Sequence, residues 1–396
     1  MTTFSLPEPS LRRATATLNA AVRSWFVVAF IGQIVFGVAV ASFYGLTAAR
    51  GDLHRWNISG GWKHGDAVGN LSIAMHLATA VIVMLSGCLQ FIPRLRARHP
   101  RFHRVNGRLY VTAGVVLSAA GVYLTWFRSR VGDVPQHLAS TLNAVLIWAF
   151  AAIAIRYAIR RDIAAHRRWA LRFFLVLSAS YFFRLSFFLV IVIAGHPVGF
   201  DPTTLIGWLP TTIAFGQYLV PLAVLELYLR AQTNPGAVRR FVAAGVVFLM
   251  TLATAAGIVV VTAANWLPDV RKGFDFRTPV AVTLWSTIER RGIDAAIQEY
   301  RALRAAPPAN YNFDESELNS LGYRLLRGKR YPEAIRILQL NAEVYPRSSN
   351  VYDSLGEAFA GAGDKPRAIA YYEKAIQVDP KNSDASAMLQ KLRGRA

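Results

Sequence analysis

Long apolar stretches separated by short polar segments occupy the first two thirds of the chain. A transmembrane helix needs about 20 mainly apolar residues, and the pattern predicts an all-α fold with a polytopic membrane helix bundle of about seven such helices. The stretches cover residues 24–47, 69–92, 105–127, 137–159, 169–194, 204–229 and 239–264. They define a transmembrane helical domain of residues 24–264, after an N-terminal cytoplasmic segment of residues 1–23.

The first stretch has an alternative interpretation as a secretory signal. Ala39, Val40 and Ala41 resemble a cleavage site. The stretch is longer than the apolar core of a typical signal, so we expect it to be retained as a span.

From about Asn265 onward the chain is polar and repeats itself with a period of 34 residues. The matched positions are Leu321-Gly322 with Leu355-Gly356, Ala334 with Ala368, and Pro346 with Pro380. This pattern resembles the tetratricopeptide repeat, in which each unit is a pair of antiparallel helices. Glycine and alanine let the paired helices approach closely, and proline ends the second helix.

The resemblance predicts a linker of residues 265–281 and a soluble tetratricopeptide-like helical repeat domain of residues 282–396. Two clear units cover residues 315–382, residues 282–305 form a degenerate unit, and residues 383–392 cap the stack. Modules of this type bind peptides or other proteins, so we expect a protein or peptide partner at the repeat domain.

Composition agrees with a membrane protein that has basic loops. Of the residues, 54% are hydrophobic, and the formal net charge is +21. The arginines lie at the ends of apolar stretches instead of forming one patch among aromatic residues, so we expect no nucleic acid partner. The single cysteine, Cys88, excludes disulfides within the chain and all-cysteine metal sites.

The basic loops also predict the orientation in the membrane. Lysine and arginine accumulate on the cytoplasmic side of membrane proteins, and they are most frequent in the second, fourth and sixth connections. These residues are Arg94, Arg96, Arg98, Arg101, Arg104, Arg160, Arg161, Arg167, Arg168, Arg230, Arg239 and Arg240. We therefore expect a protein of the bacterial inner membrane with a cytoplasmic N-terminus and a periplasmic or extracellular repeat domain.

Four histidines lie at or within consecutive spans. His76 lies inside the second span and His137 opens the fourth, both towards the outer side. His103 opens the third span and His166 opens the fifth, both at the cytoplasmic side. Because alternate spans run in the same direction, His76 can meet His137 across the bundle, and His103 can meet His166.

Two histidines from different helices suit the ligation of a haem iron by two imidazoles. Metal ligation by these four residues would create two haem b sites at two levels of the membrane. Arginines near the inner pair could bind the haem propionates through paired hydrogen bonds. They are Arg104, Arg108, Arg167 and Arg168.

Two resemblances follow from these motifs. The passages "HLATAVIVMLSGCLQFIPRLRARHPRFHRVNGRLY" and "RRDIAAHRRWALRFF" resemble a family of predicted bacterial membrane proteins whose domain has no known function, over about Ala67 to Ala194. The order of histidines on four consecutive helices is similar to cytochrome b561, which carries electrons across membranes through two haems. That similarity implies haem ligation by His76, His137, His103 and His166. The chain departs from that family in having seven predicted spans instead of six, and in placing three of the ligands at helix ends.

A structural interpretation stands beside each functional one. His103 and His166 can serve as interfacial residues among arginines, His137 as a helix-start residue, and His76 as a hydrogen-bonded residue of the bundle core. The remaining histidines are predicted surface residues: His54, His64, His99 and His196.

Arg184 lies about ten residues from the outer end of its span, or about 15 Å by helical rise. A charge at this depth requires a partner. An anionic ligand would satisfy it, and so would backbone carbonyls, Asn143 or Gln217. Glu226 is predicted to be a poor partner because it lies near the opposite end of its own span.

These features support three functional hypotheses. The first is electron transfer across the membrane by b-type haem, with the repeat domain binding a partner outside. The second is a membrane-anchored scaffold or assembly factor that acts through its repeats and has structural histidines. A carrier or lipid-active enzyme that uses Arg184 is the third. The sequence contains no P-loop, dinucleotide-binding fingerprint, zinc-protease signature or nucleophile elbow, and it identifies no catalytic residue.

Overall fold

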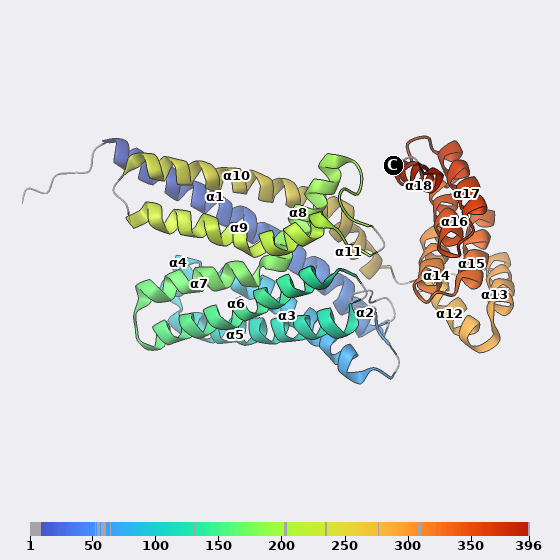
Figure 1. The fold of residues 1–396 in the computed structure, drawn as a ribbon. Coiled ribbons are helices and arrows are strands. Elements are labelled where there is room, and N and C mark those ends of the chain that lie inside the picture. The colour runs from blue at the N-terminus through green and yellow to red at the C-terminus, as the bar shows by residue number, and fades with distance from the viewer. Residues whose placement is uncertain are drawn as a thin grey trace, which may run out of the picture. The chain divides into compact units, whose positions relative to one another are not determined.

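The structure is a computed structural model that divides into two compact units, which we describe separately. They are the membrane unit, residues 1–274, and the repeat unit, residues 275–396. Figure 1 shows both units. The structure describes residues 9–394 with the exception of residues 52, 54–55, 57–60, 64, 130, 202–203, 234–235, 276 and 308–309. The predicted surface residues His54 and His64 lie outside the described residues.

The membrane unit is helical throughout its spans. Its elements are α1 (Pro9–Val40), η1 (Ala41–Gly45), α2 (Leu46–Ala49), α3 (Ala67–Leu89), α4 (Pro93–Arg98), α5 (Pro100–Tyr123), η4 (Leu124–Arg128), α6 (Val134–Ile159), α7 (Ile163–Leu177), α8 (Ala179–Ala194), α9 (Trp208–Thr233), α10 (Ala237–Val261), η5 (Thr262–Trp266) and α11 (Leu267–Gly273), in which η marks π-helical turns. Six of the described helical segments are long and apolar enough to cross a membrane, and the pair α7–α8 makes a seventh span. The predicted membrane helix bundle is confirmed.

Aspartate caps define where three spans begin. Asp66, Asp133 and Asp162 precede α3, α6 and α7, and the carboxylate of each accepts a hydrogen bond from a backbone N–H in the first turn. These bonds satisfy donors that the helix itself leaves open. Each span therefore starts at a polar side chain just outside its apolar run.

The span formed by α7 and α8 is bent by 49° at Ser178. The Ser178 hydroxyl accepts a hydrogen bond of 2.9 Å from Gln33 of α1, and Gln33 accepts one of 3.1 Å from the thiol of Cys88 on α3. All three residues are buried. This polar link joins α1 and α3 to the bent span at its bend.

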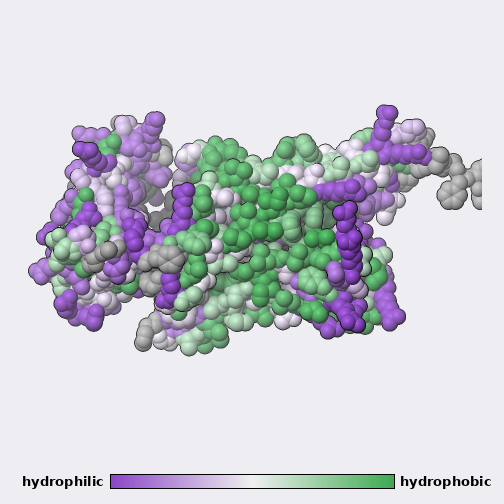
Figure 2. Space-filling model, turned by 180° about the vertical axis from the view of Figure 1, so that it is seen from behind, coloured by the Kyte–Doolittle hydropathy of each residue, from purple (hydrophilic) through white to green (hydrophobic). Residues whose placement is uncertain are grey.

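Figure 2 shows an apolar band across one face of the membrane unit, with hydrophilic side chains at both of its ends. Many large hydrophobic residues of this unit are exposed, among them Val27, Leu71, Trp148 and Leu249. In water, so large an apolar surface would be unfavourable. The chain is therefore a membrane protein whose outer surface contacts lipid.

The basic connections lie together at one end of the membrane unit, which we call the basic end. Figure 1 shows α4, the start of α7, the end of α9 and the start of α10 at this end. Arg240 at the start of α10 donates a hydrogen bond to Thr15 near the start of α1. We call the opposite end of the membrane unit the far end.

The repeat unit contains three helical hairpins and a terminal helix. Its helices are α12 (Val280–Arg291), α13 (Ile293–Ala305), α14 (Glu315–Arg327), α15 (Tyr331–Val344), α16 (Ser349–Gly361), α17 (Lys365–Val378) and α18 (Ser383–Arg393). Two short parallel strands, β1 (Thr278–Pro279) and β2 (Tyr311–Asn312), flank the first hairpin. The first helices of successive hairpins pack against one another, as do the partners within each hairpin. The predicted helical repeats are confirmed.

Small residues let the hairpins close as the 34-residue period predicts. A Cβ added to Gly322 would lie 2.5 Å from Leu338, and one added to Gly356 would lie 2.7 Å from Tyr372. Ala334 and Ala368 are fully buried at equivalent positions of the second helices. Larger residues at these positions would separate the paired helices.

Helices cover parts of two predicted segments. Residues 9–23 of the predicted N-terminal segment belong to α1, and residues 265–273 of the predicted linker lie in η5 and α11. Within η5, Trp266 stacks on Phe36 with 5.0 Å between ring centroids. An apolar run in the sequence marks only the part of a helix that lies inside lipid. It does not show how far the helix continues into polar residues or into residues packed against another helix.

Candidate functional site

The inner histidine pair lies at the basic end of the membrane unit. His166 of α7 is hydrogen-bonded through Nδ1 to the carbonyl of Ala154 on α6, at 2.9 Å. His103 of α5 lies within electrostatic range of His166 and of Arg96. The structure therefore brings the predicted inner pair into the same region.

The four arginines predicted to bind propionates lie on the same two helices as these histidines, α5 and α7. The side chains of Arg104, Arg108, Arg167 and Arg168 are exposed, and none forms an ion pair within the described part of the chain. A headgroup or another anion at the basic end could reach them.

The outer pair is arranged differently. His76 of α3 is hydrogen-bonded through Nδ1 to the carbonyl of Leu117 on α5, at 3.2 Å, and its ring lies about 3.5 Å from where a Cβ on Gly121 would be. His137 of α6 packs edge-on against Trp126 of η4, with 5.3 Å between ring centroids. Helices α3 and α6 both pack against α5. No contact between the two rings occurs among the described interactions.

Two observations bear on whether these residues suit a haem. A carbonyl can only accept, so Nδ1 of His76 and of His166 carries the proton and Nε2 has its lone pair available, as in metal-bound histidines. The Nε2 atom of His137 is buried and has no hydrogen-bond partner within the described residues. Haem ligation by the four histidines remains a prediction, and so does its basis in the layout of cytochrome b561.

Arg184 of α8 bonds mainly to its own helix. Its Nη1 donates to the carbonyl of Ser180 at 2.9 Å and to the Ser180 hydroxyl at 2.5 Å. The guanidinium carbon lies 5.1 Å from the ring centroid of Phe36 on α1. Neither Asn143 nor Gln217, the predicted side-chain partners, bonds to it; Gln217 donates to the carbonyl of Ala214 instead.

An intramembrane ion pair escaped the sequence analysis. Glu226 of α9 accepts from Arg172 of α7, with Nε–Oε1 at 2.8 Å and Nη2–Oε1 at 2.5 Å. The Arg172 guanidinium also lies 4.8 Å from the ring centroid of Trp169. The two residues of this ion pair are 54 positions apart in the sequence, and only the packing of α7 against α9 brings them together. The expectation that Glu226 is not the partner of Arg184 is confirmed.

A second missed residue is Arg128, which ends η4 at the far end. The residue is only 4% exposed. Its guanidinium donates to the carbonyl of Gly61 at 2.6 Å and to Asn70 at 3.3 Å, and it lies 3.5 Å from the carboxylate of Asp66. Arg128 therefore fixes the segment before α3 to the end of η4. Arg128 lies directly after the predicted span of residues 105–127, so its burial was not expected from the sequence.

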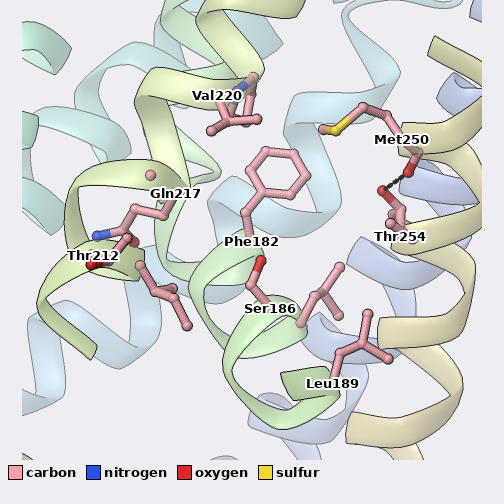
Figure 3. A pocket seen from close by; sticks show the side chains of 13 residues that line it. Phe182, Ser186, Leu189, Thr212, Gln217, Val220, Met250 and Thr254 are labelled. Atoms are coloured by element: carbon pink, nitrogen blue, oxygen red, sulfur yellow. Dashed lines mark hydrogen bonds between the residues drawn. The ribbon is translucent and has the colours of Figure 1, made fainter. Parts of the chain in front are cut away.

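A cavity of about 290 Å³ lies among α8, α9 and α10. Figure 3 shows Phe182 and Leu189 in its wall, with polar groups from Ser186, Thr212 and Gln217. None of the predicted histidine ligands lines it. The side chain of Arg184 leaves α8 on a different face from Phe182 and Ser186, because neighbours two positions away point to opposite sides of a helix.

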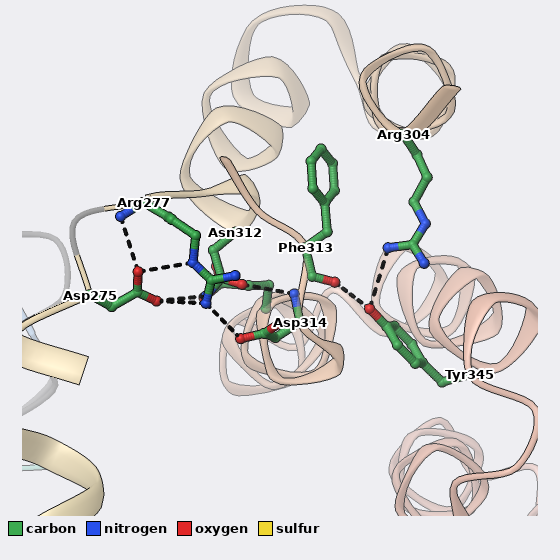
Figure 4. Close-up of polar contacts among 8 residues, drawn as sticks. Asp275, Arg277, Arg304, Asn312, Phe313, Asp314 and Tyr345 are labelled. Carbon is green, nitrogen blue, oxygen red and sulfur yellow. Dashed lines mark hydrogen bonds and ion pairs between the residues drawn. The ribbon is translucent and has the colours of Figure 1, made fainter. Parts of the chain in front are cut away.

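The start of the repeat unit is held by a polar cluster, which Figure 4 shows. Arg277 bonds to Asp275 at 3.1 Å and to Asp314 at 3.2 Å, and Asn312 donates to Asp275 at 3.2 Å. In the same view, Tyr345 donates to the carbonyl of Phe313. These contacts join the strands β1 and β2 to α14 and α15, and their role is structural.

The first helices of the repeats carry a set of residues that we call the acidic face: Asn319, Tyr323, Asp353 and Glu357. Asp353 and Glu357 are one turn apart on α16, and Asn319 and Tyr323 occupy the same positions one period earlier on α14. The Tyr323 hydroxyl donates to Glu357 at 2.6 Å. Burial, and then the charges of Glu357 and Asp384, raise the pKa of Asp353 to about 6. Asp353 has no hydrogen bond or ion pair from its side chain within the described residues.

Comparison with known proteins agrees with this two-part organisation. No curated protein matches the chain. Residues 73–220 match a family described as "Predicted membrane protein (DUF2306)". Residues 349–382, which form α16 and α17, match the tetratricopeptide repeat. The chain therefore contains a membrane domain of the DUF2306 type, which includes His76, His103, His137 and His166, followed by a tetratricopeptide repeat.

Proposed function

We propose that this protein is a membrane-anchored interaction protein, whose spans hold a repeat unit that binds another protein. The observation that carries this proposal is the acidic face. Its Asp353 carboxylate is partly buried among other carboxylates, and it has no cationic partner within the described part of the repeat unit. Burying a charge without a partner is unfavourable, and a cation supplied by a second protein would relieve the cost.

The chemistry of the acidic face indicates a basic partner segment. Asp353 accepts hydrogen bonds when ionised, and the Oδ1 atom of Asn319 is a buried acceptor without a partner within the described residues. Lysine and arginine side chains offer several donors and no acceptor. A segment that places lysine or arginine against α14 and α16 is therefore the expected ligand.

We test this proposal by photocrosslinking in cells that produce the full-length protein. A photoreactive residue at Ser320, exposed on α14 beside the acidic face, is compared with one at Ala370, exposed on α17. We expect a defined protein adduct from position 320 that is absent from position 370 and at least fivefold weaker in Asp353→Asn. Equal adducts from both positions, or no adduct from either, would contradict the proposal.

Orientation is part of the proposal. The basic end carries the arginine-rich connections, so we expect it to face the cytoplasm and the repeat unit to lie on the periplasmic side of a bacterial inner membrane. Cys88 is buried, so a cysteine introduced at exposed Ala387 can report accessibility alone. Labelling of A387C by an impermeant maleimide in intact spheroplasts supports this orientation, and labelling only after lysis reverses it.

Haem binding is the second candidate function. It is supported by the Nδ1–carbonyl bonds of His76 and His166, which leave Nε2 available in both rings. Bound haem would supply one-electron chemistry. His76 and His137 would hold the iron of one haem, and His103 and His166 would hold the iron of a second. We expect a Soret band in the purified protein if this function holds, with loss of absorbance in His166→Ala. A colourless preparation from haem-replete cells would exclude it.

A further inference from the structure

Arg184 has donors that the protein leaves open. A guanidinium has five N–H donors, and the two bonds to Ser180 use those of Nη1. Nε and Nη2 have no hydrogen-bond partner in the described residues, and no carboxylate there lies within ion-pair distance of the guanidinium. The ring of Phe36 offers a weak electrostatic contact at 5.1 Å.

The position of Arg184 makes these open donors costly. The residue lies ten positions before Ala194, the last residue of the bent span, so it is about 15 Å from the far end by helical rise. Ionisable groups inside a span are unfavourable unless they pair or line a polar cavity. Arg172, which also lies in this span, has Glu226 as a partner, whereas Arg184 has only its own helix and an aromatic ring.

The open edge of Arg184 has a specific shape. Nε–H and one N–H of Nη2 point in parallel, and this edge binds both oxygens of a carboxylate or phosphate at once. The side chain is half-buried, and its hydrogen bonds to Ser180 are not enclosed by protein atoms. A ligand oxygen therefore has access to the edge.

Two further polar side chains lie in the neighbourhood of Arg184. Arg184 is within electrostatic range of His76 on α3 and of Tyr44 in η1. The bond from Nδ1 of His76 to Leu117 leaves Nε2 without a partner in the described residues. Arg184 of α8 and His76 of α3 thus lie in the same half of the membrane unit, and each has at least one nitrogen atom without a hydrogen-bond partner in the described residues.

We propose that the Nε–Nη2 edge of Arg184 binds the carboxylate or phosphate headgroup of an anionic ligand inside the far half of the membrane unit. Nε2 of His76 can only accept, so its place in this proposal is to accept a hydrogen bond from the protonated oxygen of a phosphate headgroup. The apolar surroundings favour a ligand with an apolar tail, such as a phospholipid or a fatty acid. A free inorganic anion shares the headgroup chemistry and is separated from a lipid by the test.

The test is native mass spectrometry of the full-length protein, purified in detergent and stripped of lipid. The protein is titrated with 1-palmitoyl-2-oleoyl phosphatidic acid, with oleate and with inorganic phosphate. We expect phosphatidic acid or oleate to bind with one saturable site, and Arg184→Gln to weaken that site at least tenfold. Arg184→Lys keeps the charge but lacks the two-donor edge, so we expect an intermediate loss. His76→Leu removes the acceptor Nε2 and should weaken the binding of phosphatidic acid about threefold, while the binding of oleate is unchanged.

A matched control removes an arginine elsewhere. Arg156, exposed near the end of α6, loses the same charge in Arg156→Gln without touching the proposed site, and we expect wild-type affinity. If Arg184→Gln does not fold, the comparison of wild type with Arg184→Lys decides. Binding of inorganic phosphate as tight as that of the lipids would identify a free anion as the ligand. Equal affinity of wild type, Arg184→Lys and Arg184→Gln for all three probes would overturn the proposal.

Discussion

The ring of Tyr372 lies directly against the backbone of Gly356. A Cβ at position 356 would be 2.7 Å from Cδ1 and Cε1 of the ring, which is closer than real Cβ atoms approach a neighbour. Tyr372 is 1% exposed, so its ring cannot move into open space. Glycine at this position therefore sets the distance between α16 and α17.

We predict that Gly356→Ala destabilises the repeat unit by about 1–3 kcal/mol, the usual cost of overpacking a core. Hydrogen exchange of peptides from α16 and α17, followed in the full-length protein, measures the change. Tyr372→Leu vacates part of the ring space, so the double variant should be less destabilised than the sum of the single variants. If the effects of the two substitutions on stability simply add, the contact between position 356 and Tyr372 is not the cause of the destabilisation.

At the far end, we predict that Gly69→Ala acts through Arg128. An added Cβ would lie 2.5 Å from Nη1 of Arg128 and would displace the guanidinium from Gly61 and Asn70. The loss of charge-assisted hydrogen bonds should cost about 1–3 kcal/mol. Faster hydrogen exchange in residues 65–73 is the expected readout, and Arg128→Met should reproduce it. Unchanged exchange in both variants would mean that Arg128 does not hold this segment.

Arg128 and Arg172 illustrate which structural features can be predicted from a pattern in the sequence and which cannot. Span length and the 34-residue period are local properties, so the bundle and the repeats could be predicted from them. The partners of Arg128 and Arg172 lie 62 and 54 positions away in sequence, and only helix packing brings them together. The sequence places Arg172 inside a predicted span and Arg128 directly after one, but it does not show the partner of either residue.

The pairing of the histidines is a second feature that the sequence alone does not determine. Sequence places His76 and His137 at similar depths, but it does not determine the rotation of each helix about its axis. A membrane helix is apolar towards lipid as well as towards its neighbours, so its hydrophobic pattern marks the inward face only weakly. The His76 ring bonds to α5, and His137 packs against Trp126.

We predict that the ion pair between Arg172 and Glu226 stabilises the contact between α7 and α9. Glu226→Gln keeps the shape but removes the charge, and it should lower stability by about 1–3 kcal/mol, the range for hydrogen bonds to charged groups. Thermal unfolding in detergent, followed by tryptophan fluorescence, provides the measurement. Adding Arg172→Met should recover part of the loss, because it removes the cation left without a partner. If adding Arg172→Met instead lowers the stability again by the same amount, the ion pair is not the source of the stabilisation.

Asp353 should make the stability of the repeat unit depend on pH. Its pKa in the folded state is about 6, raised chiefly by burial and further by Glu357 and Asp384, whereas an unfolded aspartate has a pKa of about 3.9. The folded state therefore binds the proton more tightly, so stability falls as the pH rises from about 4 to about 6 and stays low above that range.

Asp353→Asn removes this titration. We expect the variant to be more stable than wild type by about 1–3 kcal/mol at pH 7.5 and nearly equal to it at pH 4, since a shift of one unit corresponds to about 1.4 kcal/mol. Hydrogen exchange of α16 peptides in the full-length protein, corrected for the intrinsic effect of pH on exchange, measures the difference. Glu373→Gln on α17, whose carboxylate pairs with Arg393, is the control and should show no gain at pH 7.5. The acidic face is proposed to bind a cation from a partner protein. The carboxylate of Asp353 would therefore lower the stability of the free protein and favour the complex with the partner. If Asp353→Asn is less stable than wild type at pH 7.5, this relation between stability and binding is wrong.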